Sequence, residues 1–196
     1  MFSQILCAAG CGRTALTGSR ICAIHAANAE AETERISALI REQTEIRDIN
    51  APGLNFDGQD FSGRVFYGCN FREASFNDCK FTGVKMRMCF FDFASFFNSD
   101  FSGSDLQFLS FAGSIIKNCS FKGSELVHIN FSGTAVNGTI FNNSNLYNSR
   151  FIKADISNTN FIDCNVKRVN FIKTHREEVN FKSSNTAEAV FEMEAS

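Results

Sequence analysis

Three cysteines and one histidine near the start of the chain have the types and spacing of a metal-binding site. Three residues separate Cys7 from Cys11, and two separate Cys22 from His25. Zinc takes four nitrogen or sulfur ligands in a tetrahedron, and two close pairs joined by a loop supply them without a long chain closure. The spacing predicts a structural Zn2+ site made by Cys7, Cys11, Cys22 and His25. The alternative is a chance cluster, with Cys7 and Cys22 as small core residues.

The first fifty residues must position these ligands, and their composition differs from that of the rest of the chain. Glycines beside the first cysteine pair allow tight turns, and Cys22 and His25 share a face if a helix starts there. Residues 1–25 are similar to small zinc-finger modules that end in Cys-x-x-His. We expect a helix over residues 26–48, with an apolar stripe that includes Ile36 and Ile46. The helix either caps the first coil of the following domain or forms a dimerising coiled coil.

A five-residue repeat determines the fold of the remaining chain. From Phe56 onward, large apolar residues recur at every fifth position, and 18 of the 23 phenylalanines lie in this register. Positions two residues earlier are small, and positions two residues later are often glycine. A period of five fits neither a long helix nor a simple strand. Each unit therefore reads as a short extended segment with a small and a large inward residue, followed by a bend.

Units such as Asn70-Phe71 and Asp105-Leu106 resemble the repeat of the pentapeptide-repeat family. The resemblance covers roughly residues 50–191. It implies an all-β solenoid, a right-handed quadrilateral parallel β-helix in which four units close one coil of 20 residues. We expect about seven coils over residues 49–191, a rod of roughly 34 Å, and a short tail over residues 192–196.

Residues 20 apart must then share one face of the rod. The column that begins at Phe61, here named the first face, and the column that begins at Phe71, the third face, keep phenylalanine in every coil. The second and fourth faces carry Leu, Ile and Val from Leu106 onward. The sequence thus predicts two opposed phenylalanine ladders, with Phe101 stacked on Phe121. Arg176 breaks the pattern, and we expect a bulge or a frayed last coil there.

The other chemistry-bearing residues are explained by the repeat. Five cysteines occupy the small inward positions and are expected to be buried free thiols: Cys69, Cys79, Cys89, Cys119 and Cys164. The glycines are periodic, and no catalytic triad, phosphate-binding loop or pair of carboxylates is recognisable. A filled tube has no pocket for a small-molecule substrate. We therefore expect a protein that is not an enzyme.

Apolar side chains outside the inward register indicate a contact surface. The candidate partner-binding residues are Met88, Phe90, Phe93, Phe97 and Phe108. On the square model, all but Phe97 gather around the third face, and Phe97 follows on the fourth. The alternative is that the N-terminal helix folds back and covers them.

Composition and the first residues of the chain indicate the compartment of the protein. The chain has 196 residues, 44% of them hydrophobic, and a formal charge of −2. It has no apolar run long enough for a membrane span, and Met1 to Cys7 lack the features of a signal peptide, so we expect a cytoplasmic protein with reduced thiols.

Two functions remain. The first is a non-catalytic scaffold that binds a protein partner of unknown identity, with a homodimer as one form. The second follows from the resemblance: some pentapeptide-repeat proteins of the quinolone-resistance type imitate DNA and bind DNA gyrase. That mechanism needs a field of negative charge, and residues 51–196 carry nearly equal numbers of acidic and basic residues.

Overall fold

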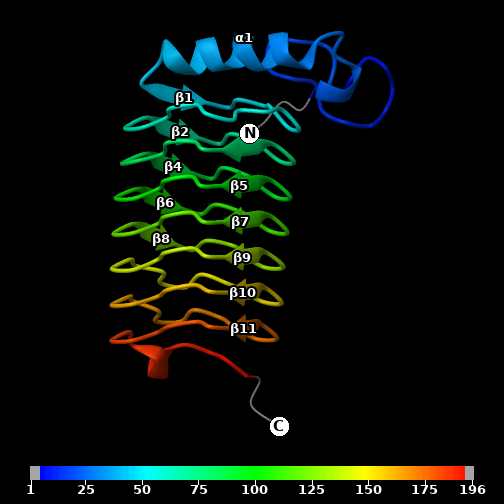
Figure 1. The fold of residues 1–196 in the computed structure, drawn as a ribbon. Helices are drawn as coiled ribbons and strands as arrows, with labels where there is room; N and C mark the ends of the chain where they lie inside the picture. Colours follow the sequence, from blue (N-terminus) through cyan, green and yellow to red (C-terminus); the bar gives the residue numbers. More distant parts are fainter. Residues whose placement is uncertain (1–4, 193–196) are drawn as a thin grey trace.

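The rod is built of coils in which residues 20 apart lie side by side. In the computed structural model, which describes residues 5–192, parallel bridges join positions such as Lys80 to Asp100 and Asp100 to Ser120. The coils stack along one axis, with the N-terminal helix at one end and the last described coil at the other (Figure 1). The fold is a parallel β-solenoid of about seven coils, as the sequence predicts.

Two of the four faces contain regular strands of three residues each. The second face is a sheet in the order β1-β2-β4-β6-β8, and the fourth face is a sheet in the order β11-β10-β9-β7-β5-β3. The second-face strands are β1 (Glu45–Arg47), β2 (Val65–Tyr67), β4 (Lys85–Arg87), β6 (Asp105–Gln107) and β8 (Glu125–Val127). The fourth-face strands are β3 (Ser75–Asn77), β5 (Ser95–Phe97), β7 (Ile115–Lys117), β9 (Ala135–Asn137), β10 (Asp155–Ser157) and β11 (His175–Glu177). Single bridges connect the coils on the first and third faces.

The corners of the square explain the glycine column. The residue two positions after each large inward residue has a positive φ, for example 66° at Gly103 and 53° at Asn98. Glycine and asparagine adopt this left-handed conformation at little cost, whereas bulky side chains do so at a penalty. Met88, Phe93 and Phe108 nevertheless occupy such corners, with φ of 54°, 59° and 58°.

Stacked phenylalanines fill the tube. The rings of Phe101 and Phe121 are 4.7 Å apart and nearly parallel, which confirms the predicted ladder on the first face. The third-face ladder is equally regular, with Phe131 4.7 Å from Phe151. Rings of the two opposed ladders meet edge to face, the arrangement that the ring quadrupole favours. Buried aliphatic residues follow Leu106 on the second and fourth faces, as predicted.

The small inward column carries hydroxyl and thiol groups that bond to the backbone. Ser99 Oγ donates to the carbonyl of Phe76 in the coil before it. The five cysteines of this column are all buried and free, as expected. Burial raises the pKa of Cys119 and of Cys164 to about 11, so both remain protonated and unreactive at neutral pH.

The N-terminal end of the tube is covered by α1 (Ala29–Arg41), which is shorter than the predicted 26–48. Asn28 caps its start by accepting a hydrogen bond from the backbone N–H of Ala31 at 3.0 Å. Ile46 is not on the helix but is the first inward residue of the tube, in β1. Ile36 and Ile40 pack into the core, so they are unavailable as the seam of a coiled coil.

Of the two alternatives expected for the last coil, a bulge and a frayed coil, the structure contradicts the bulge. Arg176 pairs with Ile156 in the parallel ladder, so the predicted bulge is absent. Its side chain is exposed, and its guanidinium lies 4.9 Å from the centre of the Phe191 ring. A short 3-10 helix, η2 (Thr186–Glu188), turns the chain before Phe191 stacks on Phe171 at 5.1 Å. Of the predicted tail, only Glu192 lies within the described residues.

Candidate functional site

The predicted metal ligands lie on a small hairpin and on the turn that precedes α1. An antiparallel bridge joins Leu6 to Thr14, and the backbone N–H of Cys7 donates to the carbonyl of Arg13 at 2.8 Å. Gly10 and Gly12, both with positive φ, make the turn between the strands of this hairpin. Cys22 caps a second 3-10 helix, η1 (Ala23–His25), which brings its sulfur and the His25 ring to one side.

The four ligand atoms have the spacing of a tetrahedral site. All lie within 4.8 Å of one another. The Cys11 and Cys22 sulfurs are 3.7 Å apart, and His25 Nδ1 lies 3.6 Å from the Cys7 sulfur and 3.5 Å from the Cys22 sulfur. Bonds of about 2.3 Å to sulfur and about 2.0 Å to nitrogen place tetrahedral ligands roughly 3.5 to 3.8 Å apart. The cluster can therefore hold a metal ion.

Local hydrogen bonds prepare one thiol to act as a ligand. The backbone N–H of Cys22 donates to the Cys7 sulfur at 3.4 Å, and this bond is the main reason why the pKa of Cys7 falls to about 6. The Cys7 sulfur in turn raises the pKa of His25. Because thiolates are the metal-binding form of cysteine, Cys7 is ready to bind at neutral pH.

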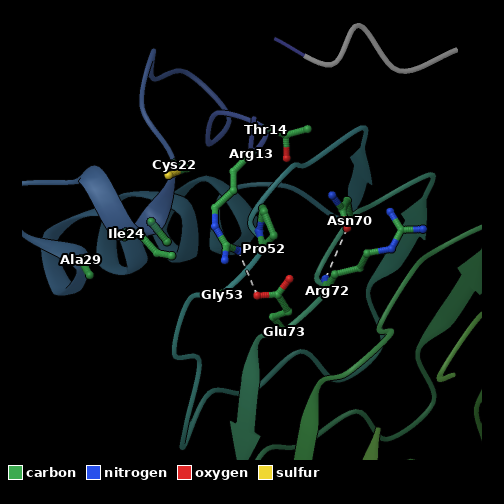
Figure 2. Close-up of a pocket in the computed structure, with 11 residues that line it drawn as sticks. Arg13, Thr14, Cys22, Ile24, Ala29, Pro52, Gly53, Asn70, Arg72 and Glu73 are labelled. Carbon is green, nitrogen blue, oxygen red and sulfur yellow. Dashed lines mark hydrogen bonds and ion pairs between the residues drawn. The ribbon is translucent and has the colours of Figure 1, made fainter. Parts of the chain in front are cut away.

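A pocket of about 480 Å³ separates the metal-ligand hairpin from the third face of the rod (Figure 2). Arg13 reaches across it to Glu73, with 3.2 Å between Nη1 and Oε2. Arg72 on the far wall pairs with Asp92 at 2.7 Å and lies 4.4 Å above the Phe90 ring. These cations are already paired with carboxylates, and the sequence offered no sign of this pocket.

The outward apolar residues gather where the sequence places them. Met88, Phe93 and Phe108 are 57%, 69% and 55% exposed, at the two edges of the third face, and Phe90 lies half-buried between them. The Phe93 ring packs over Gly113 of the next coil, where a Cβ atom would come within 2.6 Å of it. Together, Met88, Phe90, Phe93 and Phe108 are named here the aromatic patch.

Phe97 is separate from the aromatic patch. It ends β5 on the fourth face, half-buried between Asn77 and Lys117. The helix does not cover the patch: α1 lies across the end of the tube (Figure 1), and the three edge residues are exposed. The alternative that the N-terminal helix folds back over these residues is therefore wrong.

An aromatic column continues beyond the residues that the sequence singled out. The His128 ring stacks on Phe108 at 4.8 Å and meets Tyr147 edge to face at 6.0 Å. Arg168 donates to the Tyr147 hydroxyl at 3.1 Å. The signal was present in the sequence, because residues 108, 128, 148 and 168 form one corner column.

These features define a repeat protein of the β-solenoid class with a Cys/His cluster at its N-terminal end. The sequence model of the pentapeptide repeats matches residues 53–87, 94–133 and 129–168, with eight copies of the repeat. The chain belongs to the pentapeptide-repeat family.

Comparison with solved structures gives weak overall similarity. Full-length QnrB1, a plasmid-mediated fluoroquinolone resistance protein, matches at 14% identity over 72% of this chain and 83% of its own, with a TM-score of 0.39. HetL of Nostoc sp. strain PCC 7120, involved in heterocyst differentiation regulation, matches at 11% identity over 81% and 95%, with a TM-score of 0.34. Rfr23 of Cyanothece 51142 matches at 15% identity over 81% and 99%, with the same score. No curated protein matches the chain.

Residues 5–192 include no helix with the length and apolar character needed to cross a bilayer.

Proposed function

We propose that this protein is a non-catalytic binding module whose third face docks a protein partner through the aromatic patch. The observation that carries the proposal is the placement of Met88, Phe93 and Phe108. Each is more than half exposed and occupies a left-handed corner, where glycine or asparagine would be more stable. Exposed apolar side chains held at a cost to stability are typical of contact surfaces.

A double variant, Phe93→Asn with Phe108→Asn, tests this proposal. Asparagine keeps the corner conformation, so the rod should remain folded while the apolar surface is lost. The matched control replaces Ile115 and Ile140, which are 47% and 39% exposed on the fourth and first faces, by serine. Partners captured by the full-length protein should be lost with the first variant and retained with the control. Equal retention by both variants would contradict the proposal.

We also propose that the Cys7, Cys11, Cys22 and His25 cluster holds a structural Zn2+. The support is the match between the ligand separations and a zinc tetrahedron, together with a donor set of three sulfurs and one nitrogen. Elemental analysis of the purified full chain should find about one zinc ion per molecule, and Cys11→Ser should lower that content. The proposed compartment is the cytoplasm, because all eight cysteines are free.

The DNA-imitating alternative has less support in the charge pattern. Carboxylates that could stand in for phosphates are paired with cations in several places, as in Arg72–Asp92 and Arg87–Asp105. Lys80 lies between Asp60 and Asp100 in the first-face column. A DNA gyrase supercoiling assay separates the two functions: inhibition that survives loss of the aromatic patch would favour the alternative.

A further inference from the structure

The two halves of the third face differ in chemistry. The aromatic patch occupies the half of the face nearer to α1, whereas exposed cations occupy the same face farther along. Arg150 lies in the central column, and Lys153 and Lys173 lie on the edge below Phe93 and Gly133. In the part of the chain that the structure describes, none of these three cations makes an ion pair with a carboxylate.

Acidic residues are absent from a long stretch of this face. In four consecutive described coils, the third face and its two edges comprise residues 107–113, 127–133, 147–153 and 167–173, and none of these is Asp or Glu. The coils on either side carry acidic residues on this face, among them Glu73, Asp92 and Glu188, each paired with a cation. The opposite, first face carries four aspartates in its first coils, Asp57, Asp60, Asp78 and Asp100, with Lys80 among them. Charges that nearly cancel along the sequence are thus separated around the rod, and the third face is the positive side.

The surface between the aromatic patch and the cations is uncharged and carries only small side chains or none. Ser110 and Asn130 occupy the central column there, and Gly113 and Gly133 occupy the edge. The Phe93 ring covers Gly113, but nothing lies within 4 Å of the position of a Cβ at Gly133, so an extended backbone can approach the coil there and bond to the polar side chains.

We propose that the third face binds an acidic, amphipathic segment of a partner protein. Apolar residues of the segment pack on the aromatic patch, and its carboxylates pair with Arg150, Lys153 and Lys173. This inference rests on the proposed function and names the chemistry of the partner. Three coils separate Phe93 from Lys153, about 14 Å at the usual strand spacing. An extended segment covers that distance in about four residues.

The chemistry of the face favours a peptide over a single-stranded nucleic acid. Base stacking needs ring faces that are open to the ligand. The Phe108 and His128 rings stack on each other at 4.8 Å, and Arg72 covers one side of Phe90. Ring edges and the apolar thioether of Met88 suit aliphatic and aromatic side chains of a protein.

Fluorescence anisotropy with synthetic peptides and the full-length protein tests the inference. The probe is a labelled peptide with a Leu-Phe-Leu block followed, about four residues later, by a block of glutamates. The matched control peptide has lysines in place of the glutamates. We expect the acidic peptide to bind about tenfold more tightly, with the difference shrinking between about 50 and about 300 mM NaCl.

Charge reversal locates the cation contact. Lys153→Glu with Lys173→Glu should weaken binding of the acidic peptide about tenfold and flatten its salt dependence. The control Lys117→Glu with Lys122→Glu, on residues at the two edges of the first face, should leave binding unchanged. Circular dichroism checks that each variant keeps the fold. Equal binding of the acidic and basic peptides, or tighter binding of an oligothymidine probe than of the acidic peptide, would overturn the inference.

The outcomes separate this inference from the proposed function. If Phe93→Asn with Phe108→Asn abolishes peptide binding while the lysine reversals do not, the aromatic patch remains a docking surface and the acidic partner is rejected. If neither change alters binding, both ideas fail.

Discussion

Replacing Phe93 by asparagine should leave the rod as stable as before, or make it more stable. Phe93 has a φ of 59°, and the left-handed conformation costs roughly 1 kcal/mol for a bulky residue, a cost that asparagine largely avoids. The residue is 69% exposed, so about a third of it is buried, against Gly113. Losing that contact costs about 0.5 to 1 kcal/mol. The two terms nearly cancel, and the expected change in the free energy of unfolding lies between zero and about +0.5 kcal/mol.

The reciprocal change provides the matched test. Asn143 occupies an equivalent corner with a φ of 60°, so Asn143→Phe should lose about 1 kcal/mol. Guanidinium denaturation followed by circular dichroism measures both variants, and an unchanged slope would show that the same structure unfolds in each. A loss of more than about 1 kcal/mol in the free energy of unfolding of Phe93→Asn would refute the reasoning. Such a loss would mean that the ring stabilises the folded rod and is not simply part of a contact surface.

Three further outcomes follow from the core and the metal cluster. Phe121→Ala should lower the free energy of unfolding by about 3 to 5 kcal/mol, because it leaves a cavity between the rings of Phe101 and Phe141. A loss of under about 1 kcal/mol in denaturant unfolding would contradict the stacked ladder. Removing metal with a chelator should raise hydrogen exchange in residues 5–25 while residues 101–171 remain protected; protection unchanged in both would argue against a metal that holds the hairpin. The affinity for zinc should fall as the pH drops below about 6, where protons compete with the metal for the Cys7 sulfur; an affinity that is the same at about pH 4 as at about pH 7 would contradict the assignment of Cys7.

The five-residue period was enough to predict the tube, because every inward position is constrained by the coils above and below it. A large residue at every fifth position, such as Phe101 and Phe121, can be buried repeatedly only if the chain turns at each unit. The metal cluster was also predictable, since two pairs of ligands need only short loops to meet. In both cases the information lies in short-range spacing along the chain.

Features that depend on position around the rod were harder to predict. Ile46 fits an apolar helical stripe as well as the inward register, and only the packing of α1 over the first coil decides between them. The cations Arg150, Lys153 and Lys173 look scattered along the chain, where acidic residues balance them, and they share a face only once the coils are stacked. The pocket beside Arg13 depends on how the hairpin docks against the rod, which the sequence does not specify.

The number of stacked coils also fixes the distance between groups along the rod. Each 20-residue coil advances the rod by about 4.8 Å without turning any face away from its neighbours. Insertion or deletion of a whole coil between Phe108 and Arg150 would therefore alter the distance between apolar and charged groups in fixed steps while preserving their alignment. The number of coils would therefore set the spacing that a partner segment must match, while each individual contact stays the same.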